Sequence, residues 1–293
     1  MRALGFLKLT CICVSVVASS PAFASCSIQN VSIGPSAEDA IFKLQPSVDA
    51  GDKSAAYRLG WFLLRATWLE RPDLRAKGLA MLQELAREGS WVSALAIGDY
   101  YSRELKDDRR AFPFYLQAAK AGYAISQGEV GRALLYGEVV ERNEGEALDW
   151  LQKAARQNIS WAHYHLFKLY SARAISADTT GWARFHLEKA AFQNFTPAQV
   201  DLARLQLSAG EVEGALFWSS VVKHVSDTKI WDDKADVIFN EASVLATTAQ
   251  VQKALTKSAT FEREYLDRIK AEFKVAVFRD VPSPKDPVTG CSP

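Results

Sequence analysis

The sequence has little cysteine and, beyond its first two dozen residues, no long hydrophobic run. It contains 4 cysteines in 293 residues, and no later stretch approaches the roughly 20 apolar residues of a membrane-spanning helix. We therefore expect no transmembrane segment once the N-terminal segment has been cleaved. A Walker loop, a dinucleotide-binding glycine fingerprint and a nucleophile elbow are also missing, which disfavours the corresponding classes of enzyme.

The first residues have the pattern of a secretory signal peptide. Two basic residues flank the start of the apolar run Leu9–Ala18, and small residues precede a cleavage site after Ala24. We predict that residues 1–24 are removed and that the protein is periplasmic or secreted, the alternative for this segment being a buried N-terminal helix. The string Phe23-Ala24-Ser25-Cys26 loosely resembles a bacterial lipobox, so a lipid anchor on Cys26 is a second way of processing the chain.

Charge and cysteine content both change on cleavage. Loss of Arg2 and Lys8 leaves 33 basic against 34 acidic residues, so we expect no general attraction to nucleic acid. Only Cys26 and Cys291 remain, and an oxidising compartment predicts a disulfide between them. A loop of that length gives a stabilisation of about 4–5 kcal/mol in the chain-entropy model. The sequence does not decide between this disulfide and lipidation.

A motif recurs along the middle of the chain. Each copy has a small or apolar pair, Gly or Asn three residues later, and Ala or Ser four residues after that. The copies are Leu85-Ala86…Gly89…Ser93, Ala118-Ala119…Gly122…Ser126, Ala154-Ala155…Asn158…Ala162 and Ala190-Ala191…Asn194…Ala198. Successive copies are 33, 36 and 36 residues apart. Because Gly and Asn tolerate the left-handed conformation that ends a helix, each unit is predicted to be a helical hairpin with a defined stop.

The third unit resembles a Sel-one-like repeat, a longer relative of the tetratricopeptide repeat. The resemblance rests on Ser126–Asn143, which contains Leu135-Tyr136-Gly137, and on Ala147–Ala155. The family usually has two glycines in the loop between the helices, whereas here only Gly137 remains and Val139 stands in the place of the second glycine. The resemblance covers about residues 52–223 as five units. It implies an all-α, right-handed α-solenoid of helix–turn–helix repeats that binds partners.

These patterns divide the chain into five parts. We predict a signal peptide at 1–24, a leader at 25–50 with a short helix near 37–44, five repeats at 51–224, capping helices at 225–279 and a flexible tail at 280–293. The first capping helix is expected from apolar residues at 237, 238, 242 and 244 within 231–246. The second should begin at the capping box of Thr247 and Gln250 and cover the last repeat.

The tetratricopeptide register predicts a partner-binding stripe on the first helix of each repeat. It combines one cation per unit with aromatic side chains, and its members are Tyr57, Trp61, Arg65, Arg103, Arg132, Tyr136, Tyr164, Lys168 and Arg204. Arginine suits carboxylates and aromatics supply rigid contact area, so the expected ligand is an acidic or extended protein segment or an anionic polysaccharide. The alternative is a solvated face on which each cation pairs with a neighbouring Glu or Asp.

The sequence offers little support for catalysis. The four histidines have no Cys or carboxylate cluster at ligand spacing, so we predict no metal, no cofactor and no catalytic residue. Ser226-Asp227-Thr228-Lys229 matches the S-x-x-K string of penicillin-recognising enzymes but lacks the S-D-N and K-T-G partners, which favours a surface loop or helix cap. The family resemblance implies a scaffold or regulator in envelope or exopolysaccharide assembly or in signalling. A cell-wall or β-lactam-active enzyme is the alternative, because some exported relatives are described in those terms.

Overall fold

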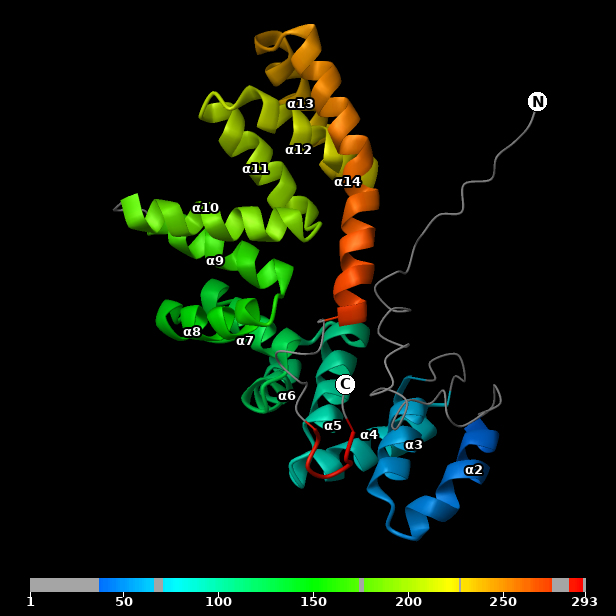
Figure 1. Ribbon diagram of the computed structural model, residues 1–293. Coiled ribbons are helices and arrows are strands. Elements are labelled where there is room, and N and C mark those ends of the chain that lie inside the picture. The colour runs from blue at the N-terminus through cyan, green and yellow to red at the C-terminus, as the bar shows by residue number, and fades with distance from the viewer. Residues whose placement is uncertain (1–36, 66–70, 174–176, 227, 276–284, 292–293) are drawn as a thin grey trace, which may run out of the picture. The chain divides into compact units, whose positions relative to one another are not determined.

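The computed structural model describes residues 37–65, 71–173, 177–226, 228–275 and 285–291, and within them every regular element is a helix (Figure 1). The predicted all-α fold class is confirmed. The chain forms two compact units, Met1–Tyr123 with Ser283–Pro293 and Ala124–Pro282. Within the described ranges, no helix has both the length and the hydrophobicity needed to cross a bilayer.

The first unit begins with α2 (Ala37–Asp49) and continues with two helix pairs. In the first pair, α3 (Lys53–Arg65) packs against α4 (Pro72–Arg87). In the second, α5 (Trp91–Asp99), prolonged by the π-helical turn η4 (Tyr100–Glu104), packs against α6 (Asp108–Lys120). The leader helix expected near 37–44 is present and continues to Asp49.

The second unit contains three further pairs and two final helices. The pairs are α7 (Ala124–Tyr136) with α8 (Glu144–Arg156), α9 (Ser160–Ala172) with α10 (Ala177–Phe192), and α11 (Thr196–Ser208) with α12 (Val212–Val225). The final helices are α13 (Lys229–Leu245) and α14 (Thr248–Val275), and each of them packs against α12.

A left-handed residue ends the second helix of four successive pairs, as the repeat predicts. The φ angles are 103° at Gly89, 100° at Gly122, 65° at Asn158 and 59° at Asn194. The residue after each one donates its backbone N–H to a carbonyl five residues earlier: Ser90 to Leu85, Tyr123 to Ala118, Ile159 to Ala154 and Phe195 to Ala190. This is the hydrogen bond of a Schellman motif, which satisfies a carbonyl at the helix end.

Small residues allow the paired helices to approach closely. The alanines at 118, 119, 154, 190 and 191 are at most 1% exposed. In the first pair the approach is closer still, because a Cβ added to Gly78 would lie 2.6 Å from the carbonyl oxygen of Gly60. Larger residues at these positions would push the helices apart.

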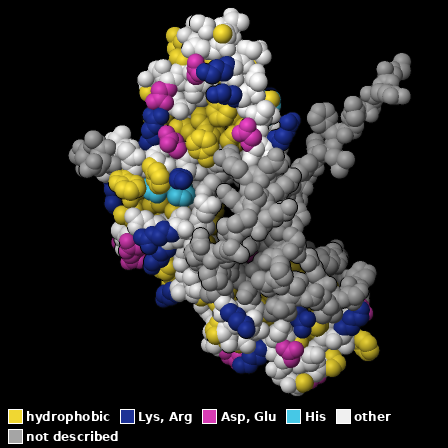
Figure 2. Space-filling model, viewed as in Figure 1, with side chains coloured by type: hydrophobic (Ala, Val, Ile, Leu, Met, Phe, Trp, Pro, Cys, Tyr) yellow, Lys and Arg dark blue, Asp and Glu magenta, His cyan; other side chains and the backbone are white. Residues whose placement is uncertain are grey.

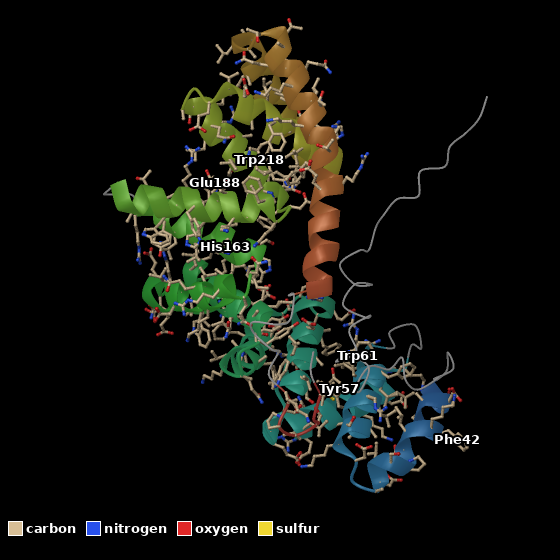
Figure 3. All side chains as sticks on the ribbon, in the orientation of Figure 1. Phe42, Tyr57, Trp61, His163, Glu188 and Trp218 are labelled. Atoms are coloured by element: carbon tan, nitrogen blue, oxygen red, sulfur yellow. The ribbon has the colours of Figure 1, made fainter. Side chains whose placement is uncertain are left out.

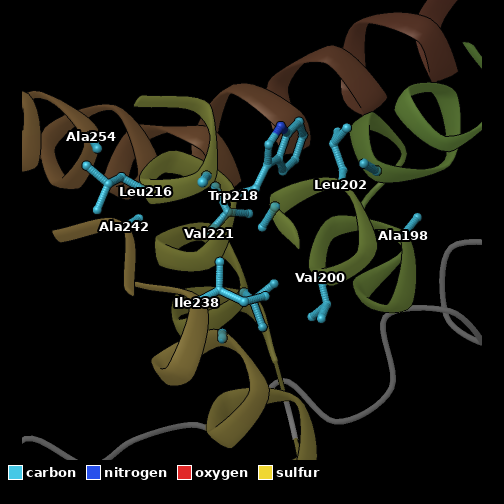
Figure 4. Packing of buried hydrophobic residues seen from close by; sticks show 14 of the residues in the cluster. Ala198, Val200, Leu202, Leu216, Trp218, Val221, Ile238, Ala242 and Ala254 are labelled. Carbon is cyan, nitrogen blue, oxygen red and sulfur yellow. The ribbon is translucent and has the colours of Figure 1, made fainter. Parts of the chain in front are cut away.

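The core of the second unit is centred on α12 (Figure 4). Trp218, which is 3% exposed, meets the rings of Phe192, Phe217 and Phe261 edge-on at centroid distances of 5.0, 5.0 and 5.4 Å. Phe261 comes from α14, which begins at the predicted capping box. The Thr247 N–H donates to Gln250 Oε1 at 2.8 Å, and the Gln250 N–H donates to Thr247 Oγ1 at 3.3 Å.

The C-terminal segment 285–291 is packed within the first unit, whereas the sequence predicts a flexible tail at 280–293 unless Cys291 is held. The rest of that tail lies outside the described residues. Asp286 and Cys291 are each 1% exposed. The Asp286 carboxylate accepts the backbone N–H of Val92 at the start of α5 at 3.2 Å, and that of Thr289 at 2.7 Å. These charge-assisted bonds hold the segment in place. Cys291 is disulfide-bonded, and Cys26 lies outside the described residues, so their pairing stays a prediction.

Candidate functional site

The predicted partner-binding residues lie on the first helix of each pair, and each unit carries its own part of the stripe. The first unit holds Tyr57, Trp61 and Arg65 on α3 and Arg103 on η4. The second holds Arg132 and Tyr136 on α7, Tyr164 and Lys168 on α9, and Arg204 on α11.

A lysine, a tyrosine and a carboxylate form a hydrogen-bonded group between α9 and α11. Lys168 Nζ lies 2.6 Å from Asp201 Oδ2, and the Tyr164 hydroxyl donates to the same oxygen at 3.0 Å. The ammonium group also lies 5.0 Å from the centroid of the Tyr164 ring. Burial opposes the charge on Lys168, but the hydrogen bonds to Asp201 and Tyr164 outweigh it and raise the pKa of the amine. Lys168 therefore keeps its positive charge, and its ammonium group is held in place by Asp201.

An aromatic group adjoins this cluster between α7 and α9. The Tyr136 hydroxyl and His165 Nδ1 are 3.1 Å apart, and Trp161 meets the His165 ring edge-on at a centroid distance of 5.8 Å. Burial, followed by the charges of Arg132 and Lys168, lowers the pKa of His165 to about 4. The imidazole is therefore neutral at pH 7 and carries one donor and one acceptor nitrogen. Tyr136 is 45% exposed, so the group is open to solvent.

The space for Trp161 is created by Gly128. A Cβ on Gly128 would lie 2.2 Å from Cη2 of the indole, well inside van der Waals contact. At the position equivalent to Gly128, the other repeats carry Tyr57, Leu95, Tyr164 and Val200. In the third repeat, the space that a side chain occupies in the other repeats is therefore filled by an aromatic ring from the fourth repeat.

Within the part of the chain that the structure describes, four of the five cations in the stripe have a carboxylate partner. The distances are 3.5 Å for Arg103–Asp99, 3.1 Å for Arg132–Glu129, 2.6 Å for Lys168–Asp201 and 2.8 Å for Arg204–Glu241. Such pairing is what the alternative interpretation, a solvated face of paired charges, predicts. The stripe therefore carries negative as well as positive side chains. Partly exposed pairs contribute about 0–1 kcal/mol, so a ligand carboxylate can replace one at small cost. Partner binding by these residues stays a prediction.

In the first unit, the stripe includes Tyr57 and Trp61 on α3 (Figure 3). Tyr57 packs against two core clusters, and burial, followed by the charge of Asp286, raises the pKa of its hydroxyl. Tyr57 therefore serves mainly to pack the unit. Arg65 is exposed and lies 5.1 Å from the centroid of the Trp61 ring.

Ser226 lies in the turn between α12 and α13. Its hydroxyl donates to the Thr228 carbonyl at 3.0 Å and accepts the Thr228 N–H at 3.2 Å. The hydroxyl therefore has local backbone partners for both its donor and its acceptor functions, as a turn-forming serine does. These contacts agree with the surface-loop interpretation of the S-x-x-K string.

A buried histidine pair joins α9 to α10. Nδ1 of His163 lies 2.8 Å from Nδ1 of His186, the two residues are 7% and 8% exposed, and Tyr170 stacks on His186. Burial is the main cause that lowers both pKa values to about 4, so both rings are neutral at pH 7. Figure 2 shows histidine beside hydrophobic side chains over these helices. Across the described ranges, no three His, Cys, Asp or Glu side chains gather as metal ligands would.

Sequence reasoning missed Asp201, His165 and the His163–His186 pair. A usable signal exists for Asp201, which follows Lys168 by 33 residues, about one repeat length. Tyr136 and His165 also lie on neighbouring first helices, but they are 29 residues apart, so an offset of one repeat length would not pair them. The histidine pair joins the two helices of one hairpin, so a repeat-length search would not find it.

Comparison with family models finds the Sel1 repeat at residues 53–90, 93–123 and 124–159. These matches cover the pairs α3–α4, α5–α6 and α7–α8. The later pairs, α9–α10 and α11–α12, lie outside the matched residues but have the same hairpin form.

Two solved structures are similar to this chain. A protective antigen of uropathogenic Escherichia coli with an SLR fold shares 21% identity at a TM-score of 0.62, over 84% of this chain and 53% of the antigen. A Sel1 repeat protein from Oxalobacter formigenes shares 21% identity at a TM-score of 0.50, over 83% of this chain and 71% of that one. This chain thus spans about half the length of the antigen. At these identities the likeness establishes the fold, an α-solenoid of helix pairs.

Proposed function

Because residues 53–159 are Sel1 repeats within an α-solenoid, we propose that this chain is a non-catalytic periplasmic adaptor or regulator that binds a protein partner. Repeat solenoids bind through extended surfaces made of equivalent positions on successive units. The observation that carries the proposal is the partly exposed cluster on α7, α9 and α11, in which Tyr136, Tyr164 and Lys168 meet His165 and Asp201.

The chemistry of this cluster favours an extended peptide segment that carries a carboxylate. Lys168 and Arg132 can receive the carboxylate, since their present partners are partly exposed and exchangeable. Asp201 can accept a backbone N–H from the same segment, and the Tyr136 and Tyr164 rings supply rigid contact area. We place the partner in cell-envelope assembly, exopolysaccharide assembly or signalling.

The test is affinity capture from an envelope extract with three matched baits. The parent chain is compared with a variant that carries Arg132→Glu, Lys168→Glu and Arg204→Glu. A control carries Arg156→Glu, Lys257→Glu and Arg263→Glu, which change the charge equally at exposed sites outside the stripe. We expect a protein that the parent and the control retain and that the stripe variant loses, with circular dichroism establishing that all three are folded.

Equal retention by all three baits would contradict the proposed binding face. If the triple variant fails to fold, Lys168→Gln with Tyr136→Ala provides a milder test, because neither change places a second carboxylate beside Asp201. A partner lost with this pair and kept by the control supports the same conclusion.

Export and processing are part of the proposal and have their own test. We propose cleavage after Ala24 and a disulfide between Cys26 and Cys291. The intact mass of the protein isolated from cells should correspond to a chain that starts at Ser25, and peptide mapping without reductant should recover the linked cysteines. A mass that includes lipid on Cys26 would instead establish the anchored form, and an uncleaved chain would contradict export by this signal.

A further inference from the structure

Helix α13 has two apolar faces, and only one of them is buried. Ala235, Ile238 and Ala242 are fully buried in the core of the second unit, where Trp231 and Phe239 pack beside them. This face lies against α12 and α11. It accounts for the position of α13 in the unit.

The other face carries Ile230, Val237 and Val244, spaced seven residues apart. Their exposed fractions are 67%, 50% and 86%. At about 100° per residue, the three side chains fall within about 40° of one another and, on average, about 135° from the buried face. They form a narrow aliphatic stripe, the α13 stripe, that points away from the unit.

A stripe of this kind is unexpected on the outside of a solenoid. Terminal helices of repeat proteins usually present a polar outer face, since exposed aliphatic rows promote association. A seven-residue spacing is also the spacing at which one helix keeps contact with another along its length. The stripe therefore fits a partner helix.

The residues that flank the stripe indicate which helix. Lys234 and Glu241 lie on one side of it, and Asp233 and Asn240 lie on the other. All four are exposed. Lys234 Nζ lies 4.4 Å from the centroid of the Trp231 ring. Glu241 forms an ion pair with Arg204 at 2.8 Å, and both side chains of this pair are half exposed. Both charged groups are therefore accessible to a second helix.

We propose that α13 pairs with α13 of a second copy, in antiparallel orientation about a two-fold axis at Val237. Reversal of the helix about that residue places Ile230 against Val244 of the second copy and Val237 against its own equivalent. It places Lys234 beside Glu241 of the second copy, and Asp233 beside Asn240. Each contact occurs twice, as a two-fold interface requires.

The self-complementary order of charges is the reason for choosing a second copy as the occupant. An unrelated partner helix, or another segment of the same chain, needs only the aliphatic stripe. Neither explains why Lys234 and Glu241 are placed so that each becomes the partner of the other when the helix is reversed. Across an interface, such complementarity mainly determines specificity.

The first test measures the oligomeric state of the purified chain by sedimentation velocity and light scattering over a range of micromolar concentrations. We expect a species of twice the mass of one chain, which is 32.4 kDa before cleavage of the signal peptide, and this species should dissociate on dilution. Val237→Glu should abolish it, because two carboxylates would face each other at the axis. Phe42→Glu, at an 80% exposed position in the first unit, is the control and should leave the dimer intact. A parent chain that is monomeric at every concentration would overturn the proposal.

The second test distinguishes a second copy from any other occupant. Lys234→Glu and Glu241→Lys should each weaken the dimer by about tenfold or more, since each brings like charges together. The double variant restores opposite charges across the axis and should recover dimerisation to within about threefold of the parent. Absence of recovery would overturn the antiparallel pairing. Glu241 pairs with Arg204 of the partner-binding stripe, whereas Val237 and Lys234 lie outside that stripe. Val237→Glu and Lys234→Glu therefore test the dimer separately from partner binding, and either proposal can fail while the other holds.

Discussion

Acid should destabilise the second unit through the buried pair of His163 and His186. Both rings are neutral and nearly inaccessible to water, and a single hydrogen bond of 2.8 Å joins their Nδ1 atoms. A second proton on the accepting ring, whichever of the two it is, would place two donors opposite each other. For His163, the nearby charge of Lys189 adds to the cost. The perturbation is a fall in pH below neutrality, with no change in sequence.

The size of the effect follows from the pKa values. Each is lowered from 6.5 to about 4 in the folded chain, so between those limits the unfolded chain binds more protons. Stability is therefore fully present above pH 6.5, falls as the pH drops, and stops changing below about 4. One such histidine accounts for about 3 kcal/mol in total and about 2 kcal/mol by pH 5. Because the two sites are coupled, the pair should lose about 2–4 kcal/mol by pH 5.

The assay is urea unfolding, followed by circular dichroism, at steps between pH 7 and pH 4.5. The parent is compared with His163→Leu/His186→Phe, since replacing both partners by apolar groups of similar shape can be nearly neutral. The free energy of unfolding of the parent should fall more steeply with decreasing pH. Acid also removes the stabilisation that comes from carboxylates such as Glu144, whose pKa is lowered by its hydrogen bond with Arg173. This loss is the same in the parent and in the double variant, so it cancels when their slopes are compared. Equal slopes for parent and double variant between pH 6.5 and 5 would refute the reasoning.

Three further predictions concern stability and use urea unfolding at pH 7. Gly128→Ala should cost about 1–3 kcal/mol, because its Cβ would overlap the Trp161 ring, and a Trp161→Ala background should relieve that cost. Asn158→Ala should cost about 1–2 kcal/mol at a φ of 65°, whereas Asn158→Gly should be tolerated; equal costs would contradict the left-handed assignment. Thr247→Ala should cost about 1 kcal/mol by removing the hydroxyl that caps α14, and no loss would show that the cap is dispensable.

The hairpin units could be predicted because their ends are specified by local chemistry. Gly89, Gly122, Asn158 and Asn194 stop helices for a reason that involves only their own backbone and the preceding turn, and their φ angles confirm it. The capping box at Thr247 is local in the same sense. Such features need no knowledge of which helix lies beside which.

The binding face could be predicted only in part because its contacts cross between repeats. The positions of Tyr164 and Lys168 follow from the register, but Asp201, which pairs with Lys168, comes from the following repeat. In the same way, the indole of Trp161 that fills the space at Gly128 comes from the repeat after Gly128. Tyr57 shows the same limit in the first unit. Its register position suggests a binding residue, whereas the C-terminal segment brings Asp286 close and the ring packs into the core.

Helix α13 shows why hydrophobic pattern alone does not define a core. The apolar residues that predict this helix include Val237, Ile238, Ala242 and Val244, yet only Ile238 and Ala242 are buried. Both sets recur at helical spacing, so each could have faced α12. Ile238 and Ala242 face it because Trp231 and Phe239 lie on the same side and bury the larger apolar area. The α13 stripe of Ile230, Val237 and Val244 therefore remains exposed. Packing of the core within one unit does not explain why this stripe has heptad spacing and is flanked by self-complementary charges.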